Sequence, residues 1–439
     1  MFLQDFAASV RSVSQAPEGA IHAMTHKTRI LPLALLGALA MPAAHAEVAI
    51  DVIGGSEVSF EGLLQTDAYW YDSDVANLDG DQGDGDDHDF GLRRAELVLK
   101  GKGPGNYEWT LGYDASGDGK FLDALVKYKI GGDKQHTLQV GQFKQPNSLE
   151  ELSSTKNNDF VSKAMVTNTF AVARRLGVGY GLGGDDWTFT ASAFGRELTR
   201  NRAHGSGYGV RGTWAPINEK GNVFNLGVSY VDYDTDGDLV RLRARPDADF
   251  ANRLADTGTL ADTDRLSTLG LEAFWLRGPF KLQGEAMRTS VDRYRAGNDD
   301  FTANGGYVSG VWNITGEAFS DKGGVPGTPG ATEPGSGMWQ LGLRYDTLDL
   351  DDGAVEGGRI DTWTVGVNWY LRSNFKLMLD YVMVDSERRG KDGDEDLVLH
   401  GNSWNENAGG PSPPASIPSR LRDTVASVAR QCRDSHQKN

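Results

Sequence analysis

The feature that most constrains the fold is a strict alternation of apolar and polar residues across residues 338–385. Over residues 361–371, odd positions are mainly aliphatic or tryptophan, as at Trp363 and Val365, whereas even positions are small or polar, as at Thr364. Because successive side chains of a β-strand point to opposite faces, this pattern predicts strands with one apolar and one polar face. Strands of about ten residues with this alternation, ending in aromatic residues, are typical of outer-membrane β-barrels, although a soluble β-sandwich shares the alternation.

Composition excludes several classes of protein. The chain has 439 residues and a net charge of −17, which argues against nucleic acid as a partner, because phosphate contacts need clusters of Lys and Arg. A hydrophobic content of 39% and a mean hydropathy of −0.44 exclude a helical membrane protein. A β-barrel is compatible with these values, because half of each strand faces water. The single cysteine, Cys432, excludes an internal disulfide framework.

The N-terminal region carries a secretory signal. Lys27 and Arg29 form a basic segment, and residues 30–40 form a short apolar run. An A-x-A cleavage motif ends at Ala46. The apolar run is too short to span a membrane, so we predict that residues 24–46 are the cleaved signal peptide of a Gram-negative envelope protein. The alternative is an amphipathic N-terminal helix.

Strand-like runs recur through the chain. We predict fifteen strands, at residues 57–71, 90–101, 106–115, 121–130, 135–144, 171–182, 186–196, 206–216, 222–233, 265–276, 279–290, 302–315, 337–348, 360–371 and 374–385. An up-and-down barrel of the outer membrane has an even number of strands, so one strand is missing from this set.

The connections between the predicted strands differ in length. Short turns rich in Gly, Pro, Asn and Asp are expected at residues 103–105, 183–185, 277–279 and 372–374. Long polar loops are expected at residues 72–89, 145–170, 234–264, 316–336 and 349–359. Short turns on one side and long loops on the other are typical of outer-membrane barrels, which favours a transmembrane barrel over a sandwich.

Both ends of the chain are predicted to lie outside the barrel domain, which spans residues 47–400. Translation is expected to start at Met24, so that residues 1–23 are an upstream misread start. Residues 394–400 begin a sixteenth strand, but the Pro-, Ser- and Arg-rich residues 401–439 contain no terminal aromatic strand. We therefore expect a last strand that is truncated or frame-shifted and an aberrant disordered tail at residues 401–439, with a genuine disordered extension as the alternative.

Several motifs, in order along the chain, resemble the phosphate-selective porin O/P family. They are Arg93-Arg94-Ala95, GQFKQP at residues 141–146, LEELSS at 149–154, RRLGV at 174–178, GYV at 306–308, NITGE at 313–317, LRY at 343–345 and TWTVGVNWYL at 362–371. The resemblance covers residues 55–390, and spaced motifs in a fixed order are a stronger signal than any one of them alone.

The resemblance implies an all-β fold, a transmembrane antiparallel β-barrel of sixteen strands, which would supply the missing strand. It also implies a homotrimeric channel in the outer membrane of a Gram-negative bacterium, in contact with lipid and lipopolysaccharide. Phosphate, polyphosphate or other small anions would diffuse passively through this channel.

Strand phase predicts which basic side chains face the lumen, where rings of Arg and Lys select anions. Arg94 alternates with the apolar residues that follow it and so points inward, whereas Arg93 is out of phase and is expected at the barrel rim or in a bulge. The same test places more basic residues on lumen faces, namely Lys127, Lys129, Arg211, Lys281, Arg344 and Lys376. Arg suits phosphate because its planar guanidinium binds two oxygens at once.

The resemblance assigns the loop at residues 145–170 as the inward-folded constriction loop. Ser153, Ser154 and Lys163 match family positions that line the narrowest zone. Asp123 matches the family's central acidic residue, which would keep an anion from binding too tightly.

Three alternating arginines form a separate candidate in the loop at residues 234–264. Arg241, Arg243 and Arg245 would project from one side of an extended segment as a ladder of cations. A solvated extracellular loop explains this run equally well.

Other residues weigh against tight phosphate selectivity. Acidic residues share the lumen faces, namely Glu96, Asp123, Glu272, Glu285, Asp346 and Asp380, so bracing of the wall explains any single lumen Lys or Arg as well as anion binding does. Thr110 stands where the family has a lumen lysine, and Lys163 replaces an arginine. These departures favour an anion-preferring channel over a tightly phosphate-selective one.

Metal and enzyme sites are not supported by the sequence. The acidic run from Asp79 to Asp89 lacks the spacing and the Glu of a Ca²⁺-binding EF-hand loop. We interpret it as a solvated extracellular loop that bridges divalent cations at the lipopolysaccharide. No nucleophile–histidine pair, P-loop or HExxH motif occurs in the barrel region, so we predict no enzyme and no cofactor.

These observations predict an outer-membrane porin through which phosphate, polyphosphate or other small anions diffuse past a constriction lined by Lys and Arg. One alternative is a general diffusion porin with little anion preference. The other is a non-transporting barrel that binds extracellular partners through its acidic loops.

Overall fold

The computed structural model describes residues 50–52, 56–73, 76–79, 87–132, 136–199, 205–331, 336–372 and 374–406. The predicted misread start, signal peptide and cleavage site lie outside the described residues, as do most of the acidic run and residues 407–439. Within the described part of the chain, no helix is long and apolar enough to cross a membrane.

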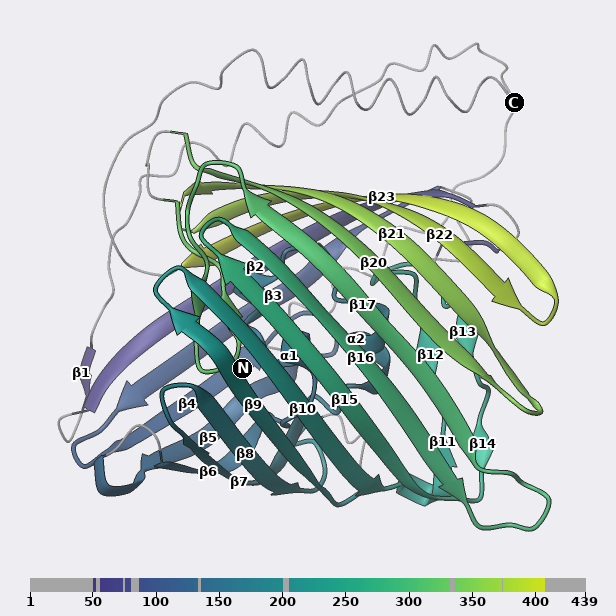
Figure 1. The fold of residues 1–439 in the computed structure, drawn as a ribbon, viewed down its shortest axis with the longest axis horizontal. Coiled ribbons are helices and arrows are strands. Elements are labelled where there is room, and N and C mark those ends of the chain that lie inside the picture. Colours follow the sequence, from purple (N-terminus) through teal and green to yellow (C-terminus); the bar gives the residue numbers. More distant parts are fainter. Residues whose placement is uncertain are drawn as a thin grey trace, which may run out of the picture. The chain divides into compact units, whose positions relative to one another are not determined.

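Among the described residues, sixteen long strands form one antiparallel sheet that closes on itself (Figure 1). They are β2 (Ser56–Asp72), β3 (His88–Lys102), β4 (Tyr107–Asp114), β5 (Lys120–Lys129), β6 (His136–Lys144), β7 (Arg174–Gly183), β8 (Trp187–Phe194), β9 (Gly207–Glu219), β10 (Asn222–Asp234), β15 (Thr263–Arg277), β16 (Phe280–Arg293), β17 (Phe301–Asn313), β20 (Met338–Asp352), β21 (Val355–Arg372), β22 (Phe375–Arg388) and β23 (Lys391–Glu406). A short strand, β1 (Ile50–Val52), pairs with β2. The antiparallel barrel and all fifteen predicted strands are confirmed.

The sixteenth strand closes the ring. β23 pairs with β22 along one edge and with β2 along the other, where Gly62 lies opposite Glu406. The expected truncation after His400 is therefore wrong, because residues 401–406 continue both ladders and β23 has 16 residues. The side-chain pattern becomes polar after His400, but a ladder needs only backbone N–H and C=O groups, which the two neighbouring strands satisfy.

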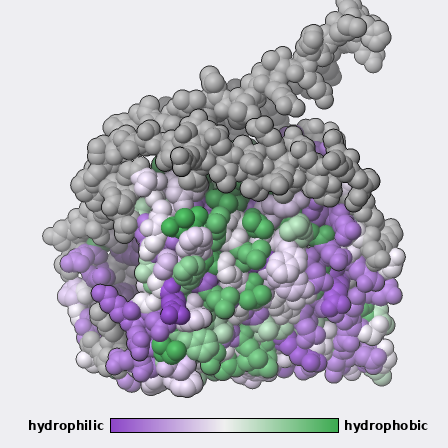
Figure 2. Space-filling model, turned by 45° about the horizontal axis from the view of Figure 1, so that its top comes forward, coloured by the Kyte–Doolittle hydropathy of each residue, from purple (hydrophilic) through white to green (hydrophobic). Residues whose placement is uncertain are grey.

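The side chains alternate across the sheet as the sequence pattern predicts. Trp363 and Val365 are 48% and 44% exposed on the outer face, whereas Thr364 and Asn368 are fully buried on the inner face. Figure 2 shows apolar surface gathered in a central zone between hydrophilic zones on either side. An outward-facing apolar band is what the hydrocarbon layer of a membrane requires of a barrel.

The connections at the two ends of the barrel differ from the prediction at two places. Residues 314–337 connect β17 to β20 at the end where the short turns lie, because consecutive strands reverse direction. The expectation that this long loop joins the others is wrong, since loop length alone does not reveal the end. The predicted loop at residues 349–359 is also wrong, because β20 and β21 extend to a tight turn at residues 353–354.

Two loops from the long-loop end fold into the barrel. The connection of β6 to β7, called loop 3 (residues 145–173), contains α1 (Leu149–Leu152), the 3₁₀ turn η4 (Thr155–Asn157) and α2 (Met165–Phe170). The connection of β10 to β15, called loop 5 (residues 235–262), contains η5 (Asp236–Asp238), β11 (Leu239–Val240), β12 (Arg243–Ala244), β13 (Ala255–Asp256) and β14 (Leu260–Ala261). Apolar residues of both loops, such as Met165 and Ala248, form a core with inner-face residues such as Leu348 and Ile360.

The connection of β17 to β20 enters the barrel from the opposite end. It contains β18 (Ser320–Asp321) and β19 (Pro326–Gly327). Arg211 of β9 donates to the backbone oxygen of Gly324 at 2.7 Å, and the hydroxyl of Thr328 donates to the backbone oxygen of Asn157 at 3.3 Å. Loops from both ends of the barrel therefore fill its interior. Separately, among the described residues the connection of β5 to β6 contains one helical element, the 3₁₀ turn η3 (Ile130–Gly132).

Candidate functional site

A carboxylate of the barrel wall holds the first helix of loop 3. Glu285 of β16 accepts hydrogen bonds from the backbone N–H groups of Leu149 and Glu150, both at 2.8 Å. These N–H groups are at the start of α1, where a helix leaves its amides without internal partners and favours a negative charge. Glu285, predicted on a lumen face, therefore anchors the loop to the wall.

Two more wall carboxylates hold the segment that follows. Asp380 of β22 accepts the backbone N–H of Val161 at 2.7 Å. Asp346 of β20 accepts the backbone N–H of Met165 at 2.6 Å. Both acidic residues lie on the lumen faces that strand phase predicts, and both are occupied by loop 3.

Basic residues of the same wall also bind loop 3. Lys281 of β16 forms an ion pair with Asp159 at 2.5 Å, and the ammonium of Lys376 of β22 donates to the backbone oxygen of Asn158. Both lysines are buried. Both lysines therefore hold loop 3, whereas the bracing alternative expected them to pair with acidic residues of the wall.

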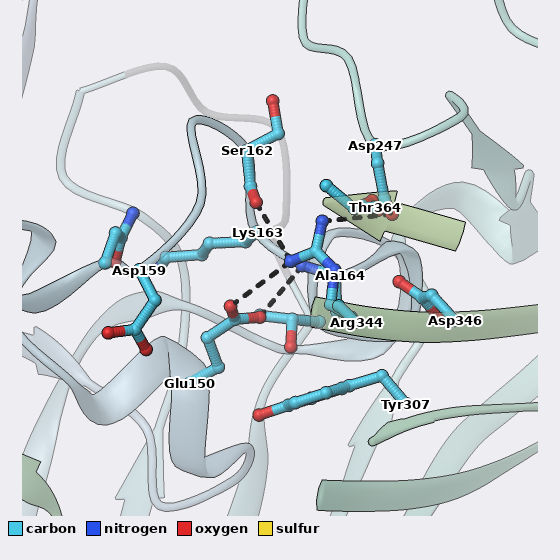
Figure 3. A network of polar contacts seen from close by, with 12 residues as sticks. Glu150, Asp159, Ser162, Lys163, Ala164, Asp247, Tyr307, Arg344, Asp346 and Thr364 are labelled. Atoms are coloured by element: carbon cyan, nitrogen blue, oxygen red, sulfur yellow. Dashed lines mark hydrogen bonds and ion pairs between the residues drawn. The ribbon is translucent and has the colours of Figure 1, made fainter. Parts of the chain in front are cut away.

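Arg344 of β20 lies at the centre of the contact between the two inner loops (Figure 3). Its guanidinium lies 3.0 Å from the carboxylate of Asp247 in loop 5 and 3.8 Å from that of Glu150 in loop 3. It also donates to the backbone oxygen of Ser162 at 3.0 Å. Arg344 is 1% exposed, so this predicted lumen cation is enclosed between the loops.

Two glycines of the wall make room for an aromatic ring of loop 3. A Cβ at Gly342 would lie 2.9 Å from the ring of Phe160, and a Cβ at Gly366 would lie 3.1 Å from it. The Arg344 guanidinium carbon lies 4.6 Å from the centre of the same ring. The ring is therefore sandwiched between an arginine and bare backbone, and larger residues at these positions would displace the loop.

Arg93 occupies a β-bulge, as its phase predicts. The pairing of β2 with β3 shifts at this point, since Gln65 lies opposite Arg94 and Thr66 lies opposite Leu92. A bulge inserts one extra residue and re-aims the side chains around it, so that both arginines turn inward. Arg93 forms an ion pair with Asp249 of loop 5, and Arg94 donates to the side-chain oxygen of Gln65 at 2.6 Å.

Charged residues gather on the side of loop 3 that faces β3 and β5–β7. We call this set the pore cluster, and it consists of Arg94, Lys144, Lys163 and Arg174 with Glu96, Asp123 and Glu151. Four basic side chains against three acidic ones leave a net charge of +1. Wall strands and loop thus bring together residues that are up to 80 positions apart in the chain (174 − 94).

Glu151 is the acidic centre of the pore cluster. Its carboxylate lies 2.5 Å from the ammonium of Lys163 and 3.8 Å from that of Lys144. Burial alone would raise the pKa of Glu151, but the two lysines outweigh burial and lower this pKa to about 2. Glu151 therefore stays ionised at any physiological pH.

The other members form pairs that are partly open to the lumen. Arg174 donates to Asp123 at 2.9 Å, and these side chains are 24% and 34% exposed. Arg94 and Glu96 lie 3.7 Å apart. Asp123 therefore neutralises part of the positive charge, in the position for which the family resemblance gives an acidic residue.

The remaining predicted site residues lie in several places. Ser153 and Ser154 follow α1, and the backbone oxygen of Ser153 accepts a hydrogen bond from Lys144 at 2.8 Å. Lys129 forms an ion pair with Glu108 at 2.6 Å, and Lys127 lies opposite Glu108 on β4.

Four further arginines predicted as site residues differ in burial and in their ion pairs, namely Arg211 and the three arginines of loop 5. Arg211 is buried and forms an ion pair with Glu272 at 2.5 Å. Exposure alternates along residues 241–245, so that Arg241, Arg243 and Arg245 project from one side while the residues between them are buried. Arg241 forms an ion pair with Asp256 of the same loop. This one-sided projection is compatible with a ladder of cations and with a solvated loop alike.

Sequence reasoning missed three members of the pore cluster, namely Lys144, Glu151 and Arg174. Strand phase does not assign them, because Lys144 is the last residue of β6, Arg174 is the first of β7 and Glu151 is in a helix. All three lie inside motifs that carry the family resemblance, so motif membership was the available signal. In the described part of the chain, no three His, Cys, Asp or Glu side chains are grouped so as to hold a metal ion.

Comparisons with known proteins agree with this architecture. The family model described as phosphate-selective porin O and P matches residues 66–405. Porin O of Pseudomonas aeruginosa is 25% identical over 406 residues, covering 80% of this chain and 90% of that protein. Among solved structures, OmpF of Salmonella typhi has a TM-score of 0.52 at 14% identity, covering 80% of this chain and 98% of that one. The trimer form of OmpT of Vibrio cholerae has a TM-score of 0.51 at 11% identity, covering 80% of this chain and 99% of that one.

Proposed function

This chain belongs to the phosphate-selective porin O and P family, and we propose that it lets small anions, phosphate among them, diffuse passively across the outer membrane. Family membership makes it an outer-membrane β-barrel porin, a channel that performs no enzymatic reaction. The proposal concerns what passes through the channel.

The observation that carries the proposal is the pore cluster. An anion that moves past loop 3 meets basic side chains from the wall and the loop, with a net charge of +1 over the cluster. A lysine ammonium group has three donors, so Lys163 retains donors beyond the one that binds Glu151. Basic groups in a constriction favour anions by replacing part of their hydration shell.

The acidic members of the pore cluster would keep binding weak. Asp123, Glu96 and Glu151 each lie within 4 Å of a basic side chain. Conduction requires that an ion bind well enough to enter and weakly enough to leave. We therefore propose a channel that prefers anions, with moderate discrimination between phosphate and other anions.

The arginines of loop 5 would raise the anion concentration at the long-loop end. Arg241, Arg243 and Arg245 project from one side of the loop, and Arg243 is exposed. Positive charge at the mouth of a low-dielectric passage attracts anions and increases their rate of entry. This ladder and the pore cluster would act in sequence along the channel.

The alternative is a general diffusion porin with little anion preference. The near balance of four basic and three acidic residues in the pore cluster favours it. The reversal potential of single channels in a planar bilayer, under a KCl gradient, separates the two. We expect a potential of the sign for chloride permeation and a concentration-dependent block by phosphate. A cation-selective potential would exclude the anion channel.

We further propose that the barrel assembles as a homotrimer through the strands β4–β8. These strands have 8–10 residues, whereas β15, β20, β21 and β23 have 15–18. A strand of eight residues, tilted by ~40°, rises only about 20 Å along the membrane normal, less than the ~25 Å apolar band. A neighbouring copy would cover a wall this short, and one solved structure of similar fold is a trimer form.

We propose, finally, that residues 24–46 direct export. The basic segment at Lys27 and Arg29, the apolar run and the motif that ends at Ala46 support cleavage before Glu47. An outer-membrane barrel has to cross the inner membrane before it folds, which is the role of such a segment.

A further inference from the structure

A second charged cavity lies at the long-loop end, away from the pore cluster. It has a volume of about 300 Å³ and is lined by Ala76, Arg253, Leu254, Ser386, Arg388, Arg389, Gly393 and Glu395. These residues come from the first long loop, from loop 5 and from the hairpin of β22 and β23. A cavity of this size is at the lower end of the range for small-ligand sites.

The described residues give the cavity a positive charge. Among them, three arginines and one glutamate line it, and three minus one leaves a net charge of +2. The carboxylate of Glu395 is 1% exposed and accepts hydrogen bonds from the backbone N–H of Ala76 and the hydroxyl of Ser386, both at 3.1 Å. Glu395 is therefore engaged by the hairpin and by the first long loop.

The arginines present unused donors. In the part of the chain that the structure describes, neither Arg253 nor Arg389 forms an ion pair. Arg388 donates from Nη2 to the backbone oxygen of Asp256 at 2.6 Å, while its Nε is buried and has no hydrogen-bond partner among these residues. A buried donor without a partner is costly, and an acceptor in the cavity would satisfy it.

The surroundings add to the positive potential. Burial, followed by the nearby charges of Arg245 and Arg243, lowers the pKa of Arg253 to about 10. The carboxylate of Asp256, which offsets some of this charge, is bound by Arg241. The ladder of loop 5 thus leads toward the cavity, and nothing anionic among the described residues faces Arg253 at ion-pair distance.

We propose that this cavity binds a dianionic phosphate group, either inorganic phosphate or the terminal phosphate of a small phosphate ester, and holds it before it enters the channel. A dianion neutralises the net charge of +2. Guanidinium groups suit it, because each one donates two parallel hydrogen bonds to phosphate oxygens. The inference deepens the proposed function and rests on it for the role of the bound anion, but the binding itself does not depend on ion selectivity.

Isothermal titration of the purified, detergent-solubilised protein tests the cavity directly. The titration uses inorganic phosphate and, separately, glycerol phosphate, at about pH 8, where phosphate monoesters are dianionic because their second pKa is about 6. The double variant Arg253→Gln with Arg389→Gln should bind phosphate about tenfold more weakly, as expected for the loss of charge-assisted hydrogen bonds. Arg277→Gln, at the opposite end of the barrel, is the matched control and should bind like the wild type.

The outcomes are distinct. Stronger binding of the ester than of phosphate would identify a phosphate ester as the ligand, and the reverse would identify free phosphate. A single Arg389→Lys variant should bind with intermediate affinity if the planar guanidinium matters beyond its charge. Wild-type affinity in the double variant would overturn the inference. The anion-channel proposal has its own test: a cation-selective wild type in a planar bilayer would overturn it, independently of the titration result.

Discussion

At the scale of single residues, Arg344 links the two loops that fill the barrel. Its guanidinium lies between Asp247 of loop 5 and Glu150 of loop 3, and it reaches the backbone of Ser162 as well. Burial comes first among the causes that act on Glu150, and it raises the pKa of this carboxyl despite the nearby arginine. The arginine thus supplies the positive charge that two buried carboxylates, one from each loop, contact.

Replacing Arg344 by Met should release both loops while leaving the barrel intact. Removing one partner of a buried ion pair costs about 3–5 kcal/mol, because the other charges stay buried and unpaired. We expect a larger single-channel conductance and faster proteolysis within loop 3, with unchanged heat-modifiable migration of the barrel on a denaturing gel. Arg359→Met is the control, since Arg359 is 56% exposed and its ion pair with Asp361 contributes little. Wild-type conductance in the Arg344 variant would contradict this role.

Replacing Glu151 by Gln should strengthen the preference for anions. The substitution changes the net charge of the pore cluster from +1 to +2, because four basic residues then face two acidic ones. We expect the reversal potential in a KCl gradient to shift further toward that of chloride. Glu219→Gln, at an exposed strand end, should leave the potential unchanged.

The low pKa of Glu151 leads to a prediction about how channel selectivity depends on pH. The pKa of Glu151 is lowered to about 2, so its ion pairs are fully formed above the ordinary carboxyl value and are lost only as the pH falls through about 2. Wild-type selectivity should therefore show no step from Glu151 between about pH 7 and pH 4, well above that value. A titration step in this range that disappears in the Glu151→Gln variant would show that the lysines do not hold this carboxylate.

At the scale of elements, β23 decides whether the sheet closes. Residues 401–406 pair with β2 as far as Gly62, so the last six residues of the strand complete the seam between the first and last long strands. An open edge would expose a row of unpaired backbone N–H and C=O groups to lipid, where no water satisfies them. Closure at this seam is thus a condition for insertion.

Two truncated chains test the seam. A chain that ends at Glu406 should refold in detergent and show the heat-modifiable migration of a closed barrel, because β23 is complete. A chain that ends at His400 loses the pairing of residues 401–406 with β2 and should fail to do so. Equal refolding of the two chains would mean that the seam is closed without these six residues.

At the scale of the whole molecule, the strands on one side of the barrel are shorter than those on the other, and the barrel encloses a charged interior. The outer face is apolar, with Val126 52% exposed on β5 and Val365 44% exposed on β21. The short wall consists of β4–β8, in which the eight-residue strands β4 and β8 rise less than the apolar band is thick, whereas β21, with 18 residues, is long enough to span it. We therefore expect lipid to cover the outer face of the long strands and a neighbouring copy to cover the outer face of β4–β8, which is the basis for the proposed trimer.

Cysteine cross-linking in membranes tests which face is covered. In a Cys432→Ser background, Val126→Cys on the short wall should form cross-linked oligomers with a short bifunctional maleimide, because copies meet at this face. Val365→Cys on the tall wall is the matched control and should remain monomeric, since lipid covers it. Oligomers from Val365→Cys alone would place the contact elsewhere, and their absence from both variants would argue for a monomer.

The sequence by itself determined the strands and their two faces. The alternation around Trp363 and Thr364 is a local property with period 2, so it predicted which side chains meet lipid and which meet the lumen. It also predicted that Arg93 lies at the barrel rim or in a bulge, because that residue breaks the local phase, and the structure shows a bulge there. The constriction loop, its serines and two members of the pore cluster, Lys163 and Asp123, came from the family resemblance, whereas Arg94 and Glu96 came from strand phase.

Only the tertiary structure decided what the lumen charges do. The contacts of Arg344 with Glu150 and of Lys281 with Asp159 join residues far apart in the chain, and alternation along a strand carries no information about a loop that folds back onto it. The same reason explains why the position of residues 314–337 and the completion of β23 escaped prediction. Both features depend on which strands are neighbours in space and on backbone hydrogen bonds between them. The pattern of side chains along one strand carries no information about either.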